Sequence, residues 1–129
     1  MIFIDIDNFR DFNNGFGHKV GDQTLCKVGQ IIKSFVRIGD KVFRYGGEEI
    51  VVTLTDCNKA NALKLAEKIR GGVSSLDNDP YPKVTVSLGI SSYPEDGKTV
   101  EEILEKSDRA LLIAKEQGKN RSIEYIDGF

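Results

Sequence analysis

The feature that most constrains the fold of this 129-residue chain is a pair of glycines between two apolar runs. The runs KVFRY and IVVTL flank Gly46 and Gly47, and this pattern predicts a β-hairpin with a tight turn. Two glutamates, Glu48 and Glu49, follow the glycines directly. Because adjacent carboxylates repel each other and Glu is a poor strand former, their position at the mouth of a strand indicates that a positive group binds there.

Composition excludes several function classes. With 40% apolar residues, the chain predicts one globular domain, residues 1–129, with a single core. A formal net charge of −2 provides no basic surface, and no apolar run could span a bilayer, so we expect no nucleic-acid partner and no direct membrane contact. Cys26 and Cys57 have neither a disulfide nor a metal spacing, and Cys26 is expected to be buried beside the apolar stripe of a helix. We expect a cytoplasmic domain, whether or not the parent protein is membrane-anchored.

Hydrophobic periodicity and turn residues predict an alternation of strands and helices. We expect strands at 2–4, 41–45, 50–54, 83–91 and 121–126, helices at about 21–38, 58–76 and 99–117, and a loop from 5 to 20. Asn58 or Asp56 is expected to cap the second helix, and Thr99 with Glu102 has the form of a capping box for the third. A strand is already under way at the first residues, which suggests a fragment of a longer multidomain protein.

This order of elements predicts an α/β fold of the α+β sandwich type: a central mixed sheet of about five strands, built around a split βαβ unit, with helices packed on it. A right-handed crossover makes the first strand parallel to the second and leaves room for the third strand between them, antiparallel to both. The third strand then begins at the edge where the first strand ends. This topology brings Glu48 beside Asp5.

Four acids converge at that edge. Asp5 and Asp7 end the first strand, and Glu48 and Glu49 begin the third. A few hard oxygen ligands, with positions left for water and phosphate, are typical of a Mg²⁺ site in polymerase-like centres, and the Ile6 carbonyl could complete the set. Alternation along a strand would send Asp5 and Asp7 to the same side. A turn can follow the strand end immediately and change the direction of Asp7, so Asp5 is the preferred ligand. For any one of these acids, a solvated strand end is the ordinary alternative.

The segment DNFRDFNNGFGHKVGD offers groups for a nucleotide. Exposed backbone N–H groups and Arg10 favour phosphate binding. Asn13 and Asp22 can read a base edge, and a carboxylate that accepts from guanine N1–H and N2–H excludes adenine. His18, the only histidine, is more typical of a structural hydrogen-bonder than of a catalyst.

Two lysines are expected on the last turn of the third helix. Lys115 and Lys119 are spaced i, i+4, so they could bind phosphates or merely compensate the helix dipole.

Three segments in order carry a resemblance to a known family. RYGGEEI resembles the signature loop of GGDEF domains in its GGEEF form, DIDNFRDFNNGFGHKVGD resembles the DxDxFKxxND…GHxxGD segment, and SDRALLIAKEQGKN resembles the helix that follows. The resemblance covers essentially the whole chain. It implies a polymerase-palm-like or nucleotide-cyclase-like sheet, which agrees with the predicted order of elements.

The resemblance also implies an activity. GGDEF domains are diguanylate cyclases: two GTP condense to cyclic di-GMP and two pyrophosphates, with one GTP on each domain of a homodimer, Mg²⁺ or Mn²⁺ as the cofactor, and a sensor domain as partner in the full-length protein. By position, the implied roles are metal binding for Asp5, the Ile6 carbonyl and Glu48, catalysis for Glu48 and Glu49, and substrate binding for Arg10, Asn13, His18, Asp22, Gly46, Gly47, Lys115 and Lys119. The glycines would make room for GTP.

The sequence RIGD at 37–40 would ordinarily be a helix end followed by a turn. At the family's spacing before the glycines, however, RxxD is the allosteric site that binds product. There Arg37 would grip guanine and phosphate, and Asp40 would bind the guanine edge.

Five positions depart from the family pattern, and the upstream DxLT segment is missing. The substitutions are Arg10 for Lys, Asn14 for Asp, Ile50 for Phe, Leu112 for Tyr and Lys119 for Arg. None removes an implied metal or guanine ligand, so the parent protein is expected to be a cyclase. The alternative is a degenerate module that only binds GTP or cyclic di-GMP as a receptor. A cyclase for another nucleotide is disfavoured by Asp22.

Overall fold

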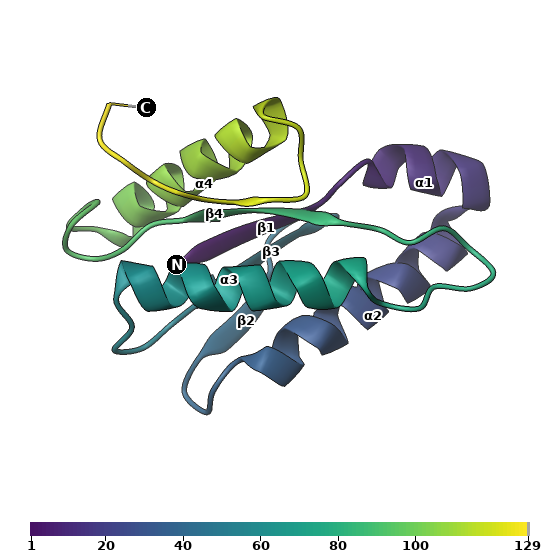
Figure 1. Cartoon of the computed structure of the whole chain (residues 1–129), viewed down its shortest axis with the longest axis horizontal. Helices are drawn as coiled ribbons and strands as arrows, with labels where there is room; N and C mark the ends of the chain where they lie inside the picture. Colours follow the sequence, from purple (N-terminus) through teal and green to yellow (C-terminus); the bar gives the residue numbers. More distant parts are fainter. Residues whose placement is uncertain (129) are drawn as a thin grey trace.

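The computed structural model describes residues 1–128, and in that part of the chain one five-stranded mixed sheet carries four helices (Figure 1). In chain order the elements are β1 (Ile2–Ile6), α1 (Phe9–Phe16), α2 (His18–Phe35), β2 (Lys41–Arg44), β3 (Glu49–Thr53), α3 (Lys59–Ser74), β4 (Val86–Ile90), α4 (Val100–Glu116) and β5 (Ser122–Glu124). Within the described residues no helix has the length and apolarity needed to cross a membrane. The predicted α/β fold is confirmed.

Strand β1 lies at the centre of the sheet, whose order is β2-β3-β1-β4-β5. It pairs antiparallel with β3 on one edge and with β4 on the other, while β2 pairs antiparallel with β3 and β5 runs parallel to β4. Strands β1 and β2 therefore point the same way with β3 between them, as the crossover argument predicts. Figure 1 shows β1 crossing the middle of the molecule below α4.

Both faces of β1 are covered, which explains the apolar run at residues 2–4. Ile2, Ile4 and Ile6 are fully buried in a cluster that also contains side chains of α2 and α3. Phe3 faces the other way and packs with Leu111 of α4. Alternate side chains of a strand point to opposite faces, so a strand buried on both sides carries apolar residues at every position.

The predicted loop at 5–20 is wrong, because most of it is helical. Helix α1 occupies Phe9–Phe16, and α2 begins at His18 rather than at Gly21. Phe9 and Phe12 are buried, and the rings of Phe12 and Phe16 lie 5.0 Å apart, so aromatic packing holds this short helix. Its asparagines and glycine, which favour turns in isolation, hid it in the sequence.

Two other local predictions need correction. Cys26 is exposed, not buried, because it lies one position beyond Leu25 and outside the buried stripe of α2. The capping box of α4 is only half formed. Thr99 Oγ1 accepts from the Glu102 N–H (3.2 Å), but the Glu102 carboxylate accepts from the Lys98 N–H instead of returning to Thr99. Asn58 caps α3 as predicted, accepting from the Asn61 N–H at 2.8 Å.

Candidate active site

The first strand and the glycine hairpin meet at one edge of the sheet. Asp5 is paired in register with Glu49, and the Ile6 N–H donates to the Glu48 carbonyl at 3.3 Å. The predicted neighbourhood of Asp5 and Glu48 is therefore present. A cavity of about 260 Å³ opens beside them. Its lining includes most of the predicted metal and phosphate groups: Asp5, Ile6, Arg10, Glu48, Lys115 and Lys119.

Asp5 is a buried carboxylate with one unsatisfied oxygen. Its Oδ2 accepts from the Lys115 ammonium, while its buried Oδ1 has no hydrogen-bond partner. Burial raises the pKa of Asp5, Lys115 opposes that rise, and the neighbouring charge of Asp7 adds to it. A buried polar atom without a partner costs free energy, so Asp5 Oδ1 is suited to a cation ligand.

The two glutamates share this unfavourable environment. Burial is the main cause that raises the pKa of Glu48 and of Glu49, and repulsion from Asp5 is the next. Three acids with raised pKa values at one strand edge form a site that is electrostatically incomplete by itself.

Each signature glycine has a different surrounding. A Cβ atom at Gly46 would lie 2.5 Å from Glu49 Oε1, whereas one at Gly47 would meet nothing within 4 Å. The absence of a side chain at Gly46 therefore makes room for Glu49. Sequence reasoning missed Arg44, whose guanidinium donates to the carbonyls of Gly46 (3.2 Å) and Gly47 (2.9 Å) and braces the turn.

The predicted base-reading residues lie on α1, which the sequence did not predict, and on α2. Asn13 is in α1, and its Oδ1 is buried without a partner against Gly21 of α2, where a Cβ would clash with it at 1.7 Å. Asp22 is the next residue of α2 and is exposed. Neither lines the cavity beside Asp5, but Arg10 does and lies one turn before Asn13 on α1. His18 is exposed at the first position of α2.

The two lysines approach the acids from α4, but in different ways. Lys115 is in the last turn of the helix, whereas Lys119 lies beyond its end at Glu116, with φ at +65°. The prediction that both belong to the helix is wrong, because the chain reverses at Gly118, where φ is +122°. The Lys119 ammonium donates to Asn8 Oδ1.

Comparison with known proteins decides the family. The family described as "Diguanylate cyclase, GGDEF domain" matches residues 1–121. The chain belongs to the GGDEF family. Diguanylate cyclase A of Treponema denticola is 40% identical over 124 residues, which are 94% of this chain and 33% of that protein. This GGDEF domain thus spans about a third of the length of that curated relative.

Solved structures agree with the assignment. The active GGEEF domain of a diguanylate cyclase from Vibrio cholerae is 34% identical, with a TM-score of 0.89 over 98% of this chain and 82% of that one. The GGDEF domain of DgcB from Caulobacter crescentus, in complex with c-di-GMP, is 31% identical, with a TM-score of 0.87 over 95% of this chain and 75% of that one. The polymerase-palm-like topology expected from the resemblance is that of these GGDEF domains.

The RxxD residues of this GGDEF domain lie away from the acids and bind each other. Asp40 Oδ2 accepts from the Arg37 N–H (2.9 Å) and Nε (3.2 Å), and Oδ1 accepts from the Thr55 N–H (3.1 Å). Although burial alone would raise it, these bonds hold the pKa of Asp40 below its usual value. The Asp40 side chain is 1% exposed and that of Arg37 is 59% exposed. Arg37 is therefore the accessible member of the pair.

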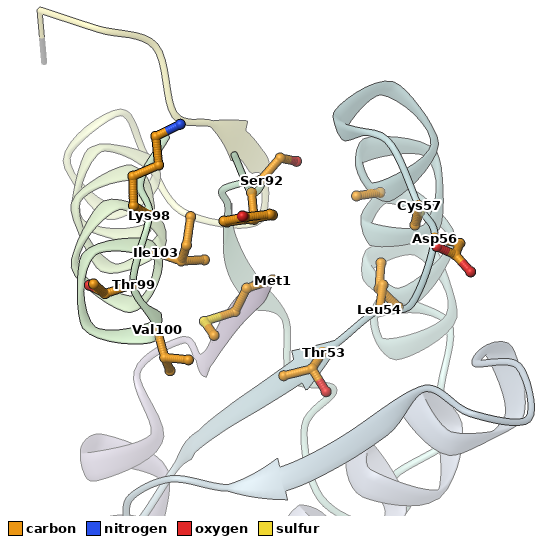
Figure 2. A pocket seen from close by; sticks show the side chains of 12 residues that line it. Met1, Thr53, Leu54, Asp56, Cys57, Ser92, Lys98, Thr99, Val100 and Ile103 are labelled. Atoms are coloured by element: carbon orange, nitrogen blue, oxygen red, sulfur yellow. The ribbon is translucent and has the colours of Figure 1, made fainter. Parts of the chain in front are cut away.

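A larger cavity in the described part of this GGDEF domain lies elsewhere. It measures about 510 Å³ and lies at the opposite end of the sheet, between the first turns of α3 and α4 (Figure 2). Met1, Thr53, Ser92 and Lys98 are among its lining residues, and none of the predicted site residues is. The buried acid with an unpartnered oxygen lines the smaller cavity beside Asp5 and not this larger one.

Proposed function

We propose that this GGDEF domain is a diguanylate cyclase, condensing two GTP to cyclic di-GMP with release of two pyrophosphates. The observation that carries the proposal is the unpartnered Oδ1 of buried Asp5, in a cavity shared with Glu48 and two lysines. A cation-binding group and phosphate-binding groups on one small cavity are the arrangement that nucleotidyl transfer needs.

The donor set fits a hard divalent cation. Asp5, Glu48 and the Ile6 carbonyl would hold Mg²⁺ or Mn²⁺. This set has only two acidic side chains, and the described residues contain no group of three or more His, Cys, Asp or Glu side chains placed to hold a metal. Two carboxylates and a carbonyl leave positions for water and phosphate oxygens, which is the usual mode of Mg²⁺ in phosphoryl-transfer sites. When bound, the metal stabilises charge on the attacking and leaving oxygens.

The side chains of the chain divide the remaining tasks. Glu48, whose pKa is raised by burial, would accept the proton of the ribose 3′-hydroxyl, with Glu49 beside it. Asn13 and Asp22 would bind guanine, and His18, which is exposed at the start of α2, would also contact the substrate. Gly46 and Gly47 would shape the turn that faces the nucleotide. The cations that would meet the phosphates are Arg10, Lys115 and Lys119.

Catalysis in this scheme requires two domains. Each holds one GTP, and the 3′-hydroxyl of each nucleotide attacks the α-phosphorus of the other, so a homodimer brings the reactants together. A sensor domain in the full-length protein would control that encounter.

The RxxD pair is proposed to bind the product. Arg37 is exposed enough to contact a guanine and a phosphate, and Lys68 of α3 lines the same cavity of about 280 Å³. Because the Asp40 carboxylate is engaged by Arg37 and Thr55, its first role is to orient the guanidinium. For Asp40 to accept a hydrogen bond from guanine, at least one of its hydrogen bonds to Arg37 must break. Inhibition from this site would be allosteric, since Arg37 does not line the cavity of Asp5.

The proposal is tested with the domain fused to a dimerising coiled coil and incubated with GTP and Mg²⁺. Chromatography should show cyclic di-GMP and two equivalents of pyrophosphate, and no cyclic dinucleotide from ATP. A dimer that binds GTP or cyclic di-GMP tightly but forms no product would refute the cyclase and support the receptor alternative.

A further inference from the structure

Asp7 is a buried carboxylate that the proposed reaction does not use. It is 7% exposed and accepts three hydrogen bonds: from Thr85 Oγ1 at 2.6 Å, from Ser87 Oγ at 2.6 Å, and from the Asn120 N–H at 3.0 Å. Thr85 and Ser87 belong to the β4 region, whereas Asn120 follows α4. One side chain therefore joins three segments that are far apart in sequence.

The segment that Asp7 holds is the one that carries Lys119. Lys119 and Asn120 both have positive φ, +65° and +48°, which is uncommon for residues other than glycine. Such a backbone persists only where surrounding contacts define it, and the bond from Asn120 N–H to Asp7 Oδ2 is one of these. A second comes from Arg121, whose Nε donates to the Lys119 carbonyl at 3.0 Å. The position of Lys119 thus depends on the anchor at Asp7.

The contacts of Asp7 also distinguish it from a metal ligand. Oδ1 accepts from Ser87, and Oδ2 accepts from both Thr85 and Asn120. Asp5, two residues earlier, instead keeps a buried oxygen without a partner. Two aspartates of one strand end therefore have different chemistry: one is available to a cation, and the other is satisfied by the protein.

We propose that Asp7 is a positioning residue for phosphate binding: its buried carboxylate anchors the Lys119–Asn120 segment so that the Lys119 ammonium faces the nucleotide cavity. The proposal rests on the proposed function, because it takes the cavity to be the nucleotide site. Asp7 is itself part of the cavity lining, but both of its oxygens are occupied by Thr85, Ser87 and Asn120, so it acts through Lys119 rather than as a ligand of the nucleotide or the metal. Its removal should weaken binding of the phosphates and leave binding of the base unchanged.

The experiment compares Asp7→Ala with Asp7→Asn in nuclear magnetic resonance titrations with GTP and with guanosine. Asp7→Ala should weaken GTP binding about tenfold, the effect expected when one charge-assisted contact is lost, and change guanosine binding less than twofold. Asp7→Asn should keep most of the wild-type GTP affinity, because the side-chain amide of Asn can accept from the Asn120 N–H and donate to a neighbouring hydroxyl. A metal ligand would behave differently, since an amide would not restore Mn²⁺ affinity.

A matched pair of serines controls for stability. Ser87 and Ser91 are both fully buried, and each donates one bond, Ser87 to Asp7 at 2.6 Å and Ser91 to the Ile103 carbonyl at 2.7 Å. Ser87→Ala and Ser91→Ala should lower the melting temperature by similar amounts. Only Ser87→Ala should weaken GTP binding, because only its bond supports the anchor.

A double-mutant cycle decides whether Asp7 acts through Lys119. If it does, adding Asp7→Ala to Lys119→Ala should weaken GTP binding less than twofold further. In Asp7→Ala alone, the Asn120 amide should exchange its hydrogen faster than in the wild type. Additive losses, an equal loss of guanosine binding, or unchanged GTP binding by folded Asp7→Ala would each overturn the inference. Failure of the wild-type domain to bind GTP at all would instead refute the proposed function.

Discussion

Two aspartate–lysine pairs with buried carboxylates lie at opposite ends of the sheet, and they differ in how many of their hydrogen-bonding groups have partners. Asp96 accepts from Lys59 with both oxygens (2.9 and 2.8 Å) and from the Ser92 N–H (2.7 Å), while Lys59 also donates to the Tyr125 carbonyl. Asp5 has the Lys115 ammonium on one oxygen and no partner on the other. The first pair is complete within the protein, whereas the second pair needs something from outside.

The difference separates structural from functional acids. A buried charge that is fully paired ties elements together, here the start of α3, the turn after β4 and the segment that contains Tyr125. A buried charge left partly unpaired, with like charges nearby, costs stability that a bound ligand can restore. The fold thus keeps an incompletely paired buried acid at the end of the sheet where the reaction is proposed.

The largest effect should come from the incomplete end. Glu48→Gln should lower cyclic di-GMP formation by the forced dimer at least about a thousandfold, because it removes both a metal ligand and the proposed proton acceptor. The circular dichroism spectrum should not change. Turnover within about tenfold of the wild type would contradict the metal assignment.

The complete end should control stability instead. Asp96→Ala should lower the free energy of unfolding by roughly 3–5 kcal/mol, because it leaves the largely buried Lys59 ammonium without its main partner. Glu105→Ala is the control, since the exposed pair of Glu105 and Arg109 spans 3.9 Å and should contribute less than about 1 kcal/mol. Urea unfolding measures both. A loss from Asp96→Ala no larger than that of the control would remove the contrast between the two ends.

The Arg37–Asp40 pair tests whether a satisfied acid can still serve a binding site. Arg37→Ala should weaken binding of cyclic di-GMP at least about tenfold, through loss of a charge-assisted contact of roughly 1.5–3 kcal/mol. Initial rates should be unchanged while product inhibition is relieved. Calorimetry with Lys41→Ala as control measures the affinity. Equal affinities for wild type and Arg37→Ala would make RIGD an ordinary helix end.

Base selectivity should be confined to the corner of α1 and α2. Asp22→Ala should reduce GTP affinity by roughly 1–3 kcal/mol, because guanine N1–H and N2–H lose their acceptor, and should hardly change ATP affinity. Gln23→Ala, at the next exposed position, is the control for local helix effects. If GTP and ATP bind Asp22→Ala as they bind the wild type, guanine is recognised elsewhere.

The smallest effect concerns pH. The pKa of Glu48 is raised in the folded state, so ionisation costs stability once the pH rises above its ordinary value near 4 and towards the folded value. Without metal, Glu48→Gln should therefore melt slightly above the wild type at neutral pH, with the difference vanishing once the pH falls below the ordinary pKa of a glutamate. Differential scanning calorimetry in a chelator measures it. If the two melting temperatures differed by the same amount at every pH, the charge of Glu48 would not be the cause of the difference.

Much of the fold and the meeting of the acids could be predicted from local sequence. The glycine hairpin and the apolar runs defined three neighbouring strands, and a right-handed crossover then placed Glu48 beside Asp5. Helix α1 could not be predicted in this way, because its asparagines and glycine favour turns and its stability comes from aromatic packing.

The partners of individual side chains were the least predictable. The carboxylate of Asp7 is bound by the amide of Asn120, 113 residues away, and no local pattern encodes such a contact. Likewise, the spacing of Arg37 and Asp40 suggested two ligand-binding groups, whereas Thr55 and Arg37 already occupy the acid. Spacing identifies candidate residues, and tertiary packing determines which of their atoms remain available.

The central position of β1 has a consequence for regulation. Asp5 lies on a strand that is hydrogen-bonded along both edges and covered on both faces. A signal could shift the backbone of such a strand only by breaking many of these contacts at once. On the proposed mechanism, output is then controlled by how often two domains with ready-made sites meet, rather than by reshaping either site. A parent protein would act on its GGDEF domains as a tether acts on two reactants, by setting their effective concentration.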